Sequence, residues 1–199
     1  RRSRGLGDVY KRQLSNNDLL RYNKHILLEE IETDGLEILK QKHVAIIGLG
    51  GLGCPLAQYL STSGIGKITL IDNDRVEETN LQRQILYTSA DIGLYKTDIA
   101  SKRLGTMNPD LNIDSHNVRF SSESINLVKD VDIIIDATDN FKSRSTINQI
   151  SLILKKPLVM GAAIKMQGQV AVFRNDLSNM PCYNCLYDDV EDEVGSCID

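Results

Sequence analysis

Cysteine is scarce in this chain of 199 residues, and no apolar run is long enough to cross a membrane. Four cysteines are too few for a disulfide scaffold and suit a reducing cytoplasm. The longest apolar runs, near residues 44–47 and 131–135, have strand length, far below the roughly 18 residues of a membrane-spanning helix. With 23 basic and 27 acidic residues, the net charge is −4, and no basic stripe for nucleic acid is present. We therefore expect a soluble, cytoplasmic globular protein with neither a membrane nor a nucleic-acid partner.

The first 13 residues differ in composition from the rest of the chain. They carry a net charge of +4, which leaves −8 for the remainder. They lack the apolar stretch of a secretory signal, and a transit peptide is the weaker alternative. We interpret residues 1–13 as a disordered, non-native leader and residues 14–199 as the domain.

From Leu14 onward, the apolar pattern predicts alternating helices and strands. Ser15 has the position of a helix cap, helical spacing continues through Leu27, and a second helical piece lies near residues 36–39. Strands are predicted at residues 43–47, 67–71, 112–118, 131–136 and 157–161, and helices at 52–63, 96–107 and 141–154. This order predicts an α/β fold, with a Rossmann-like, mainly parallel sheet, helices on both faces and an N-terminal helical segment.

A glycine-rich loop separates the first predicted strand from the helix that follows it. Gly48, Gly50 and Gly53 form GxGxxG, which permits a tight turn and brings phosphate close to a helix N-terminus. Asp72 stands 19 residues beyond Gly53, at the end of the next strand, where a carboxylate can bind ribose hydroxyls. The loop predicts a nucleotide site and leaves NAD and ATP open.

The residues after Asp72 favour a triphosphate over NAD. A dehydrogenase is expected to offer a His or Tyr acid at this point, whereas this chain has the amide-rich segment 80–84 with Arg83, followed by Lys96. Two cations can neutralise the charge that develops when a phosphorus atom is attacked. Asp139 follows the strand predicted at 131–136, at the edge of the sheet where an aspartate can hold Mg²⁺.

Taken together, these motifs resemble the MoeB/ThiF/HesA group of adenylyltransferases, which are related to the catalytic domains of ubiquitin-activating enzymes. The resemblance extends from Leu14 to Asp199 and is carried by residues 21–25 (RYNKH), 48–53 (GLGGLG), 80–84 (NLQRQ), Lys96, 108–109 (NP), 138–140 (TDN) and 182–185 (CYNC). It implies ATP- and Mg²⁺-dependent adenylylation of the C-terminal glycine of a small ubiquitin-fold sulfur carrier, which prepares a thiocarboxylate for molybdopterin or thiamine synthesis.

The resemblance also implies a role for individual residues. Gly51 and its neighbours in the loop contact the nucleotide, and Asp72 binds ribose. Segment 80–84 faces the phosphates, and Lys96 stabilises the phosphoryl group under attack. The implied nucleotide-binding set is Gly48, Gly50, Gly51, Gly53, Asp72, Asn80, Arg83, Gln84, Lys96, Asp139 and Asn140, with Arg83, Lys96 and Asp139 catalytic and Asp139 the magnesium ligand.

Two features depart from the family pattern. Lys24 replaces an arginine that reaches the partner's ATP across a homodimer, so charge is kept but the bidentate fork is lost. Cys182 and Cys185 form half of a tetrahedral zinc site. The matching CxxC would lie beyond Asp199, so we expect the C-terminal part of the domain to be missing. A free pair of thiols is the alternative.

The other two cysteines are interpreted separately. Cys197 resembles a family cysteine on a crossover loop that takes part in persulfide or acyl-disulfide chemistry in some members. A catalytic role for Cys197 and the absence of one are both left open. Cys54, at the start of a helix, is interpreted as a small packing residue.

Two other functions are weighed against the adenylyltransferase. One is an NAD-dependent oxidoreductase, and the other is a non-catalytic adaptor like the inactive half of heterodimeric ubiquitin-activating enzymes. Retention of Arg83, Lys96 and Asp139 speaks against the adaptor. Residues 161–169 are closer to the molybdopterin branch of the family, while residues 72–74 and 81–86 fit the thiamine branch equally well, so the sequence does not separate the two carriers.

Overall fold

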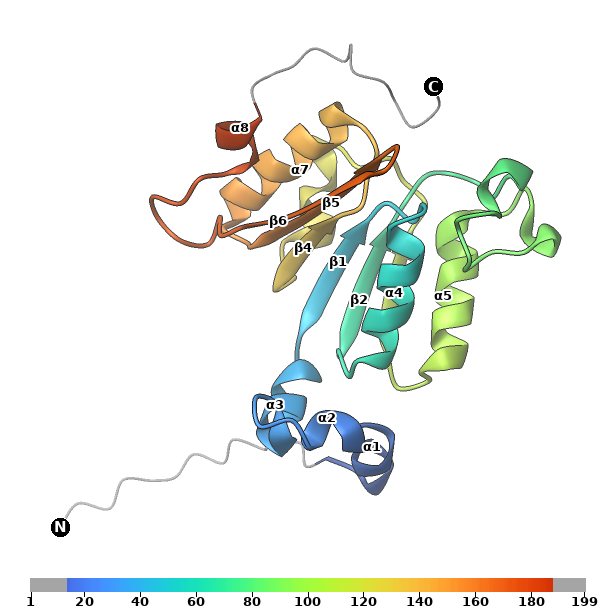
Figure 1. Cartoon of the computed structure of the whole chain (residues 1–199), viewed down its shortest axis with the longest axis vertical. Helices are drawn as coiled ribbons and strands as arrows, with labels where there is room; N and C mark the ends of the chain where they lie inside the picture. The colour runs from blue at the N-terminus through green and yellow to red at the C-terminus, as the bar shows by residue number, and fades with distance from the viewer. Residues whose placement is uncertain (1–13, 188–199) are drawn as a thin grey trace.

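A computed structural model describes residues 14–187 of the chain. Within them, a six-stranded sheet has the order β3-β2-β1-β4-β5-β6 (Figure 1). The strands are β1 (His43–Ile47), β2 (Lys67–Ile71), β3 (Asn112–His116), β4 (Ile133–Asp136), β5 (Leu158–Ile164) and β6 (Gln167–Phe173). Neighbours from β3 to β5 pair in parallel, and β6 pairs with β5 in antiparallel fashion. The mainly parallel sheet predicted from the sequence is confirmed.

The register of the central strands aligns their carboxyl ends. Ile47 of β1 pairs with Ile71 of β2 on one side and with Asp136 of β4 on the other. The chain therefore leaves all three strands at the same edge of the sheet. Between β1 and β4 the strand order reverses direction, which is the point where open α/β sheets bind ligands.

Helices cover both faces of the sheet, because alternate strand residues point to opposite sides. Val44, Ile46 and Leu70 belong to the apolar cluster under α4 (Gly53–Thr62) and α5 (Lys96–Met107). Ala45, Ile47 and Ile134 belong to the cluster that includes residues of α6 (Ile125–Val128) and α7 (Phe141–Leu154). Both clusters are buried, which confirms the two-faced architecture.

The N-terminal helical segment packs at the far end of the sheet from the carboxyl ends of the strands (Figure 1). It consists of α1 (Asn16–Arg21), α2 (Asn23–Ile26) and α3 (Glu32–Leu39). Ser15 caps α1 in a capping box with Asp18, as predicted. The single helix predicted through Leu27 is wrong, because Tyr22 leaves the helical conformation with φ −105° and ψ 20°. The buried Tyr22 hydroxyl accepts a hydrogen bond from Asn108 Nδ2 at 3.1 Å.

The other predicted boundaries agree to within a few residues. Strands β1 and β2 and helices α5 and α7 have the predicted limits, and β3, β4, β5 and α4 begin or end one to three residues away. Helix α3 begins four residues before the helical piece predicted near residues 36–39. Strand β6 was not predicted, because an edge strand exposes most of its side chains and shows no continuous apolar run. The short elements are η1 (Glu78–Asn80), η2 (Ser89–Asp91), η3 (Ser122–Ser124) and α8 (Tyr183–Leu186). Among residues 14–187, no helix is both long and apolar enough to cross a membrane.

Candidate functional site

The glycine-rich loop connects β1 to α4 at the edge where the strand order reverses. Gly48 has φ +93°, and a Cβ there would lie 2.7 Å from the carbonyl oxygen of Ala137, which follows β4. A Cβ on Gly53 would lie 2.0 Å from the carbonyl oxygen of Gly48. The backbone itself therefore demands glycine at these two positions, and the tight turn predicted from the sequence is present.

The two middle glycines are not required by crowding of the backbone. The nearest atom to a Cβ on Gly50 would be Gln84 Nε2 at 3.9 Å, and on Gly51 it would be Arg83 Cδ at 3.4 Å. Both are ordinary contacts with side chains. Glycine at positions 50 and 51 instead leaves the backbone open to close approach by a ligand, beside two predicted phosphate-binding residues.

The segment 80–84 therefore lies over the loop, as the nucleotide-site prediction requires. Arg83 is exposed, and its Nη1 donates to the carbonyl oxygen of Thr79 at 3.0 Å. Gln84 is 3% exposed, and its Oε1 is buried without a hydrogen-bond partner among residues 14–187. Asn80 is also buried, and its side chain makes long hydrogen bonds of 3.4 Å with Glu77 N and Thr79 Oγ1.

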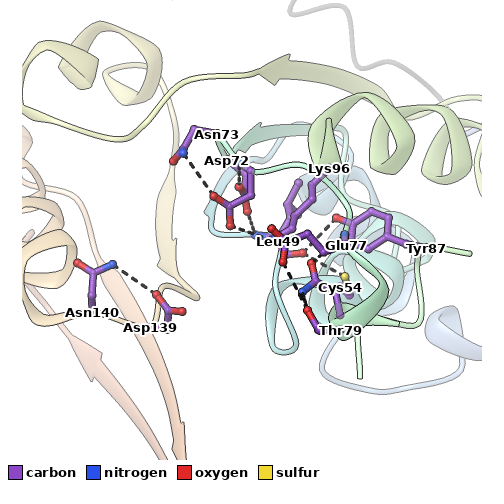
Figure 2. A network of polar contacts seen from close by, with 12 residues as sticks. Leu49, Cys54, Asp72, Asn73, Glu77, Thr79, Tyr87, Lys96, Asp139 and Asn140 are labelled. Atoms are coloured by element: carbon purple, nitrogen blue, oxygen red, sulfur yellow. Dashed lines mark hydrogen bonds and ion pairs between the residues drawn. The ribbon is translucent and has the colours of Figure 1, made fainter. Parts of the chain in front are cut away.

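Asp72 follows β2 and binds the glycine-rich loop directly (Figure 2). Its Oδ2 accepts a hydrogen bond from Leu49 N at 2.7 Å, and its Oδ1 accepts one from Asp74 N at 2.7 Å. Burial raises the pKa of the Asp72 carboxyl, against the opposing effect of the Lys96 charge and the two backbone donors. Asp72 thus stands at the end of the second strand, as expected from the sequence.

Lys96 is the first residue of α5, and its ammonium group reaches back to the strand edge. Nζ lies 2.9 Å from Asp74 Oδ2. The lysine side chain is 6% exposed, whereas that of Asp74 is 57% exposed. Asp74 is thus a site residue that the sequence reasoning did not assign. Its position two residues after Asp72 was the one available signal.

Asp139 and Asn140 occupy a separate segment at the same edge, between β4 and α7. Figure 2 shows them apart from the cluster around Leu49. Asn140 caps α7, with its Oδ1 accepting from Ser143 N at 2.9 Å. Asp139 is exposed, and its Oδ1 accepts a 3.4 Å hydrogen bond from Asn140 Nδ2. The structure brings this pair to the predicted edge without joining it to Asp72 or Lys96.

Behind this pair, Arg144 and Asp136 hold the turn between β4 and α7. Arg144 is buried, and its Nη2 donates to the carbonyl oxygen of Thr138 at 2.9 Å. Asp136 Oδ1 accepts from Thr138 N at 2.8 Å and from its hydroxyl at 2.6 Å. Burial raises the pKa of Asp136. Neither residue was predicted from the sequence, where each falls inside an element with no distinguishing motif.

Cys182 and Cys185 lie far from this cluster in sequence, at the start of α8. Their sulfur atoms are 3.7 Å apart, close to the separation of about 3.8 Å between two sulfurs bound to one tetrahedral zinc. Burial opposes ionisation of the Cys182 thiol, but hydrogen bonds from Asn148 and Cys185 outweigh it and lower the pKa. No group of three or more His, Cys, Asp or Glu side chains suited to a metal occurs within residues 14–187.

One predicted residue, Lys24, is not part of this cluster. Helix α2, which carries Lys24, packs at the opposite end of the sheet from the loop (Figure 1). Lys24 therefore does not contribute to the nucleotide site of its own chain. Cys197 and the predicted leader lie outside the described residues.

Comparison with known proteins gives a consistent result. A model of the ThiF family matches residues 22–199. The chain is 40% identical over 176 residues to "Adenylyltransferase and sulfurtransferase MOCS3" of Culex quinquefasciatus, covering 88% of this chain and 40% of the relative. It is 40% identical over 177 residues to "Sulfur carrier protein adenylyltransferase" of Thermus thermophilus, covering 87% and 65%.

Another relative and a solved structure extend the comparison. Over 188 residues the chain is 39% identical to "Molybdopterin-synthase adenylyltransferase" of Haemophilus influenzae, covering 94% of this chain and 77% of the relative. The structure of E. coli MccB with ATP matches with a TM-score of 0.74 and 27% identity, over 87% of this chain and 53% of that one. The chain thus spans between two fifths and about three quarters of the curated relatives named here.

Proposed function

The chain belongs to the ThiF family, and from this premise we propose that it uses ATP to adenylylate the C-terminal glycine of a small ubiquitin-fold sulfur-carrier protein. The product is an acyl-adenylate that prepares the carrier for thiocarboxylate formation. The carrier is of the molybdopterin-synthase or the thiamine type. Relatives named as adenylyltransferases of sulfur carriers and of molybdopterin synthase support this substrate class.

One observation carries the proposal: the loop between β1 and α4 is open at Gly50 and Gly51, beside Arg83 and Gln84. Crowding of the backbone explains the outer glycines but not these two. A ligand that approaches the backbone between an arginine and a helix N-terminus is expected to be anionic. The ATP complex of a solved relative supports a nucleoside triphosphate as that ligand.

The residues at this edge divide the work of binding and reaction. The loop amides and the N-terminus of α4 bind phosphate oxygens, Asp72 binds the ribose hydroxyls, and Asn80, Arg83 and Gln84 face the phosphate chain. Lys96 is paired with Asp74 at this edge. Its ammonium group supplies positive charge to the α-phosphate as that phosphate is attacked.

The reaction needs no general base, because the attacking group is already a carboxylate. A carboxylate oxygen of the carrier forms a bond to the α-phosphorus, and the bond from that phosphorus to the bridging oxygen breaks. The electron pair of the broken bond leaves with pyrophosphate. The enzyme contributes position and electrostatic stabilisation of the developing charge.

Two metals are included in the proposal. Asp139 offers an exposed carboxylate with one long hydrogen bond, which suits a Mg²⁺ ion held mainly by phosphate oxygens and water. When bound, Mg²⁺ would neutralise phosphate charge, and Asn140 would lie beside the nucleotide. Cys182 and Cys185 would supply two of the four ligands of a structural Zn²⁺, as their sulfur separation allows.

Homodimer formation is the remaining part of the proposal. Lys24 lies at the end of the sheet opposite its own loop. Its charge could serve a nucleotide site only in a second copy of the chain. We propose that Lys24 reaches the ATP site of a partner, while the role of Cys197 is left open.

Carrier-dependent exchange of labelled pyrophosphate into ATP tests the proposed function. We expect exchange with a molybdopterin-synthase small subunit or with a thiamine sulfur carrier, and none when the C-terminal glycine of the same carrier is deleted. The oxidoreductase alternative predicts NADH binding without exchange, and the adaptor alternative predicts neither. Either of these results would reject the proposal.

A further inference from the structure

Leu49, inside the glycine-rich loop, is hydrogen-bonded through both its amide and its carbonyl group (Figure 2). Its N–H donates to Asp72 Oδ2 at 2.7 Å. Its carbonyl oxygen accepts from the Tyr87 hydroxyl at 3.1 Å and from the Cys54 thiol at 3.2 Å. Both lone pairs of that oxygen therefore have a donor.

The two donors are buried and come from different parts of the site. Tyr87 is 4% exposed and follows the segment 80–84, whereas Cys54 is fully buried in the first turn of α4. Burial raises the pKa of the Cys54 thiol to about 11 and raises that of the Tyr87 hydroxyl as well. Both groups therefore keep their protons at neutral pH and remain donors.

The direction of the Leu49 carbonyl determines the direction of the next amide. In a trans peptide, the C=O of one residue and the N–H of the next point to opposite sides. With the Leu49 oxygen turned toward Tyr87 and Cys54, the Gly50 N–H is turned away from these buried groups. Across residues 14–187, this N–H donates to no acceptor.

Among residues 14–187, the Leu49–Gly50 peptide group makes no hydrogen bonds other than those to the Leu49 carbonyl oxygen. Gly50 has no Cβ and tolerates a wide range of φ, so the Leu49–Gly50 peptide can rotate unless its carbonyl is bound. On either side of Leu49 and Gly50, the backbones of Gly48 and Gly53 are in close contact. The donors to Leu49 are therefore the contacts that fix this peptide plane.

We propose that Tyr87 and Cys54 are positioning residues that hold the Leu49 carbonyl inward, so that the Gly50 N–H faces a phosphate group of the bound nucleotide. This inference rests on the proposed function. It changes the interpretation of Cys54, which the sequence indicated as a packing residue only. It also links two parts of the site: Tyr87, which follows the segment 80–84, holds the glycine-rich loop that Arg83 contacts at Gly51.

Tyr87→Phe in the full chain tests the proposal with little change in shape. Loss of one neutral hydrogen bond corresponds to about a fivefold weaker Kd for ATP. Adenosine, which has no phosphate, should bind with the same Kd as in the parent chain. Tyr59→Phe is the matched control, because Tyr59 is 78% exposed on α4. Calorimetry measures the Kd of ATP, and competition with ATP measures the Kd of adenosine.

Cys54→Ala and the double variant separate positioning from general loosening. Cys54→Ala should weaken ATP binding about twofold, since a thiol is a weaker hydrogen-bond donor than a hydroxyl. In the double variant, the loss of ATP affinity should exceed the product of the two single losses. An NMR spectrum of the nucleotide-free chain gives a second readout. In Tyr87→Phe, the Gly50 amide resonance should shift, while the amides of α7, which packs in the other apolar cluster, should not.

The outcomes are distinct from failure of the proposed function. If the parent chain binds no ATP, the proposed function fails and this inference fails with it. If the parent binds ATP and Tyr87→Phe binds it equally well, only the inference is overturned. Equal losses of ATP and adenosine would also overturn it, because they would indicate a general structural role for Tyr87.

Discussion

The ammonium group of Lys96 lies 2.9 Å from the carboxylate of Asp74, and the lysine side chain is 6% exposed. The cation that the site would offer to a phosphate is thus already paired in the ligand-free chain. Because Asp74 is 57% exposed, solvent screens this ion pair on one side. A bound triphosphate would replace or share the carboxylate as the counter-charge of Lys96.

Asp74→Asn should therefore separate fold stability from nucleotide binding. Loss of the counter-charge of a buried ammonium should lower the free energy of unfolding by about 1 kcal/mol, discounted for the exposure of Asp74. Saturating ATP should raise the Tm of the variant more than that of the parent, because phosphate restores a negative partner. Thermal unfolding with and without ATP measures both effects. Asp110→Asn, at an exposed aspartate, is the control. An equal rise in Tm for variant and parent would contradict the exchange of partners.

Lys96→Ala should abolish carrier-dependent pyrophosphate exchange. Removing one electrostatic contact to the transition state costs on the order of 3 kcal/mol, or about a hundredfold in rate. Lys102→Ala, at an exposed lysine on the same helix, should leave the rate unchanged. Circular dichroism should show that both variants are folded. More than half of the parental rate in Lys96→Ala would reject the role of this lysine.

Gly50→Ala should weaken ATP binding without unfolding the chain. The nearest atom to the added methyl group is 3.9 Å away, so no strain is introduced, and stability should change by less than about 1 kcal/mol. The methyl group nevertheless stands where phosphate would approach the backbone. Gly53→Ala should instead unfold the loop, since its methyl group would lie 2.0 Å from Gly48 O. Gly105→Ala, in open space on α5, is the control. Parental ATP affinity in Gly50→Ala would place the nucleotide elsewhere.

Asp91 should stabilise the segment after Tyr87 in a pH-dependent way. Burial alone would raise the pKa of its carboxyl, but hydrogen bonds from Thr88 and the charge of Arg103 lower it below the ordinary 3.8. The unfolded chain therefore binds the proton more readily, and the stabilisation is present above pH 3.8 and lost as pH falls through the folded-state pKa.

Asp91→Asn should consequently be less stable than the parent at neutral pH, by about 1 kcal/mol. The difference between the two chains should shrink as the pH is lowered below 3.8. Urea unfolding across this range measures the difference, with Asp130→Asn at an exposed aspartate as the control. A difference that stays constant with pH would show that the charge of Asp91 is not responsible.

Local sequence patterns predicted most of the fold because they reflect local physical requirements. The buried runs 43–47 and 67–71 have no other stable place than inside a sheet, and Gly48 and Gly53 mark a turn that tolerates no Cβ. Lys96 begins α5 as predicted. The helix break at Tyr22 was missed, because a single residue outside the helical conformation leaves no mark on the apolar spacing.

The contacts that organise the site were beyond such patterns. Asp74 and Lys96 are 22 residues apart, and Leu49 and Tyr87 are 38 residues apart. Each pair meets only because three parallel strands end at one edge and the chain returns over it. Asn148 approaches Cys182 in the same way, across 34 residues. Sequence spacing indicated which residues could act but not which of them bind one another.

The most direct test of the proposed function is the mass of the carrier protein itself after incubation with this chain, ATP and Mg²⁺. Intact-protein mass spectrometry, with pyrophosphatase present to draw the reaction forward, should show the addition of one AMP group per carrier, located at the C-terminal glycine. The adduct should be absent with Lys96→Ala and with a carrier that lacks that glycine. An unmodified carrier, under conditions where calorimetry shows that the chain binds ATP, would contradict the adenylyltransferase function.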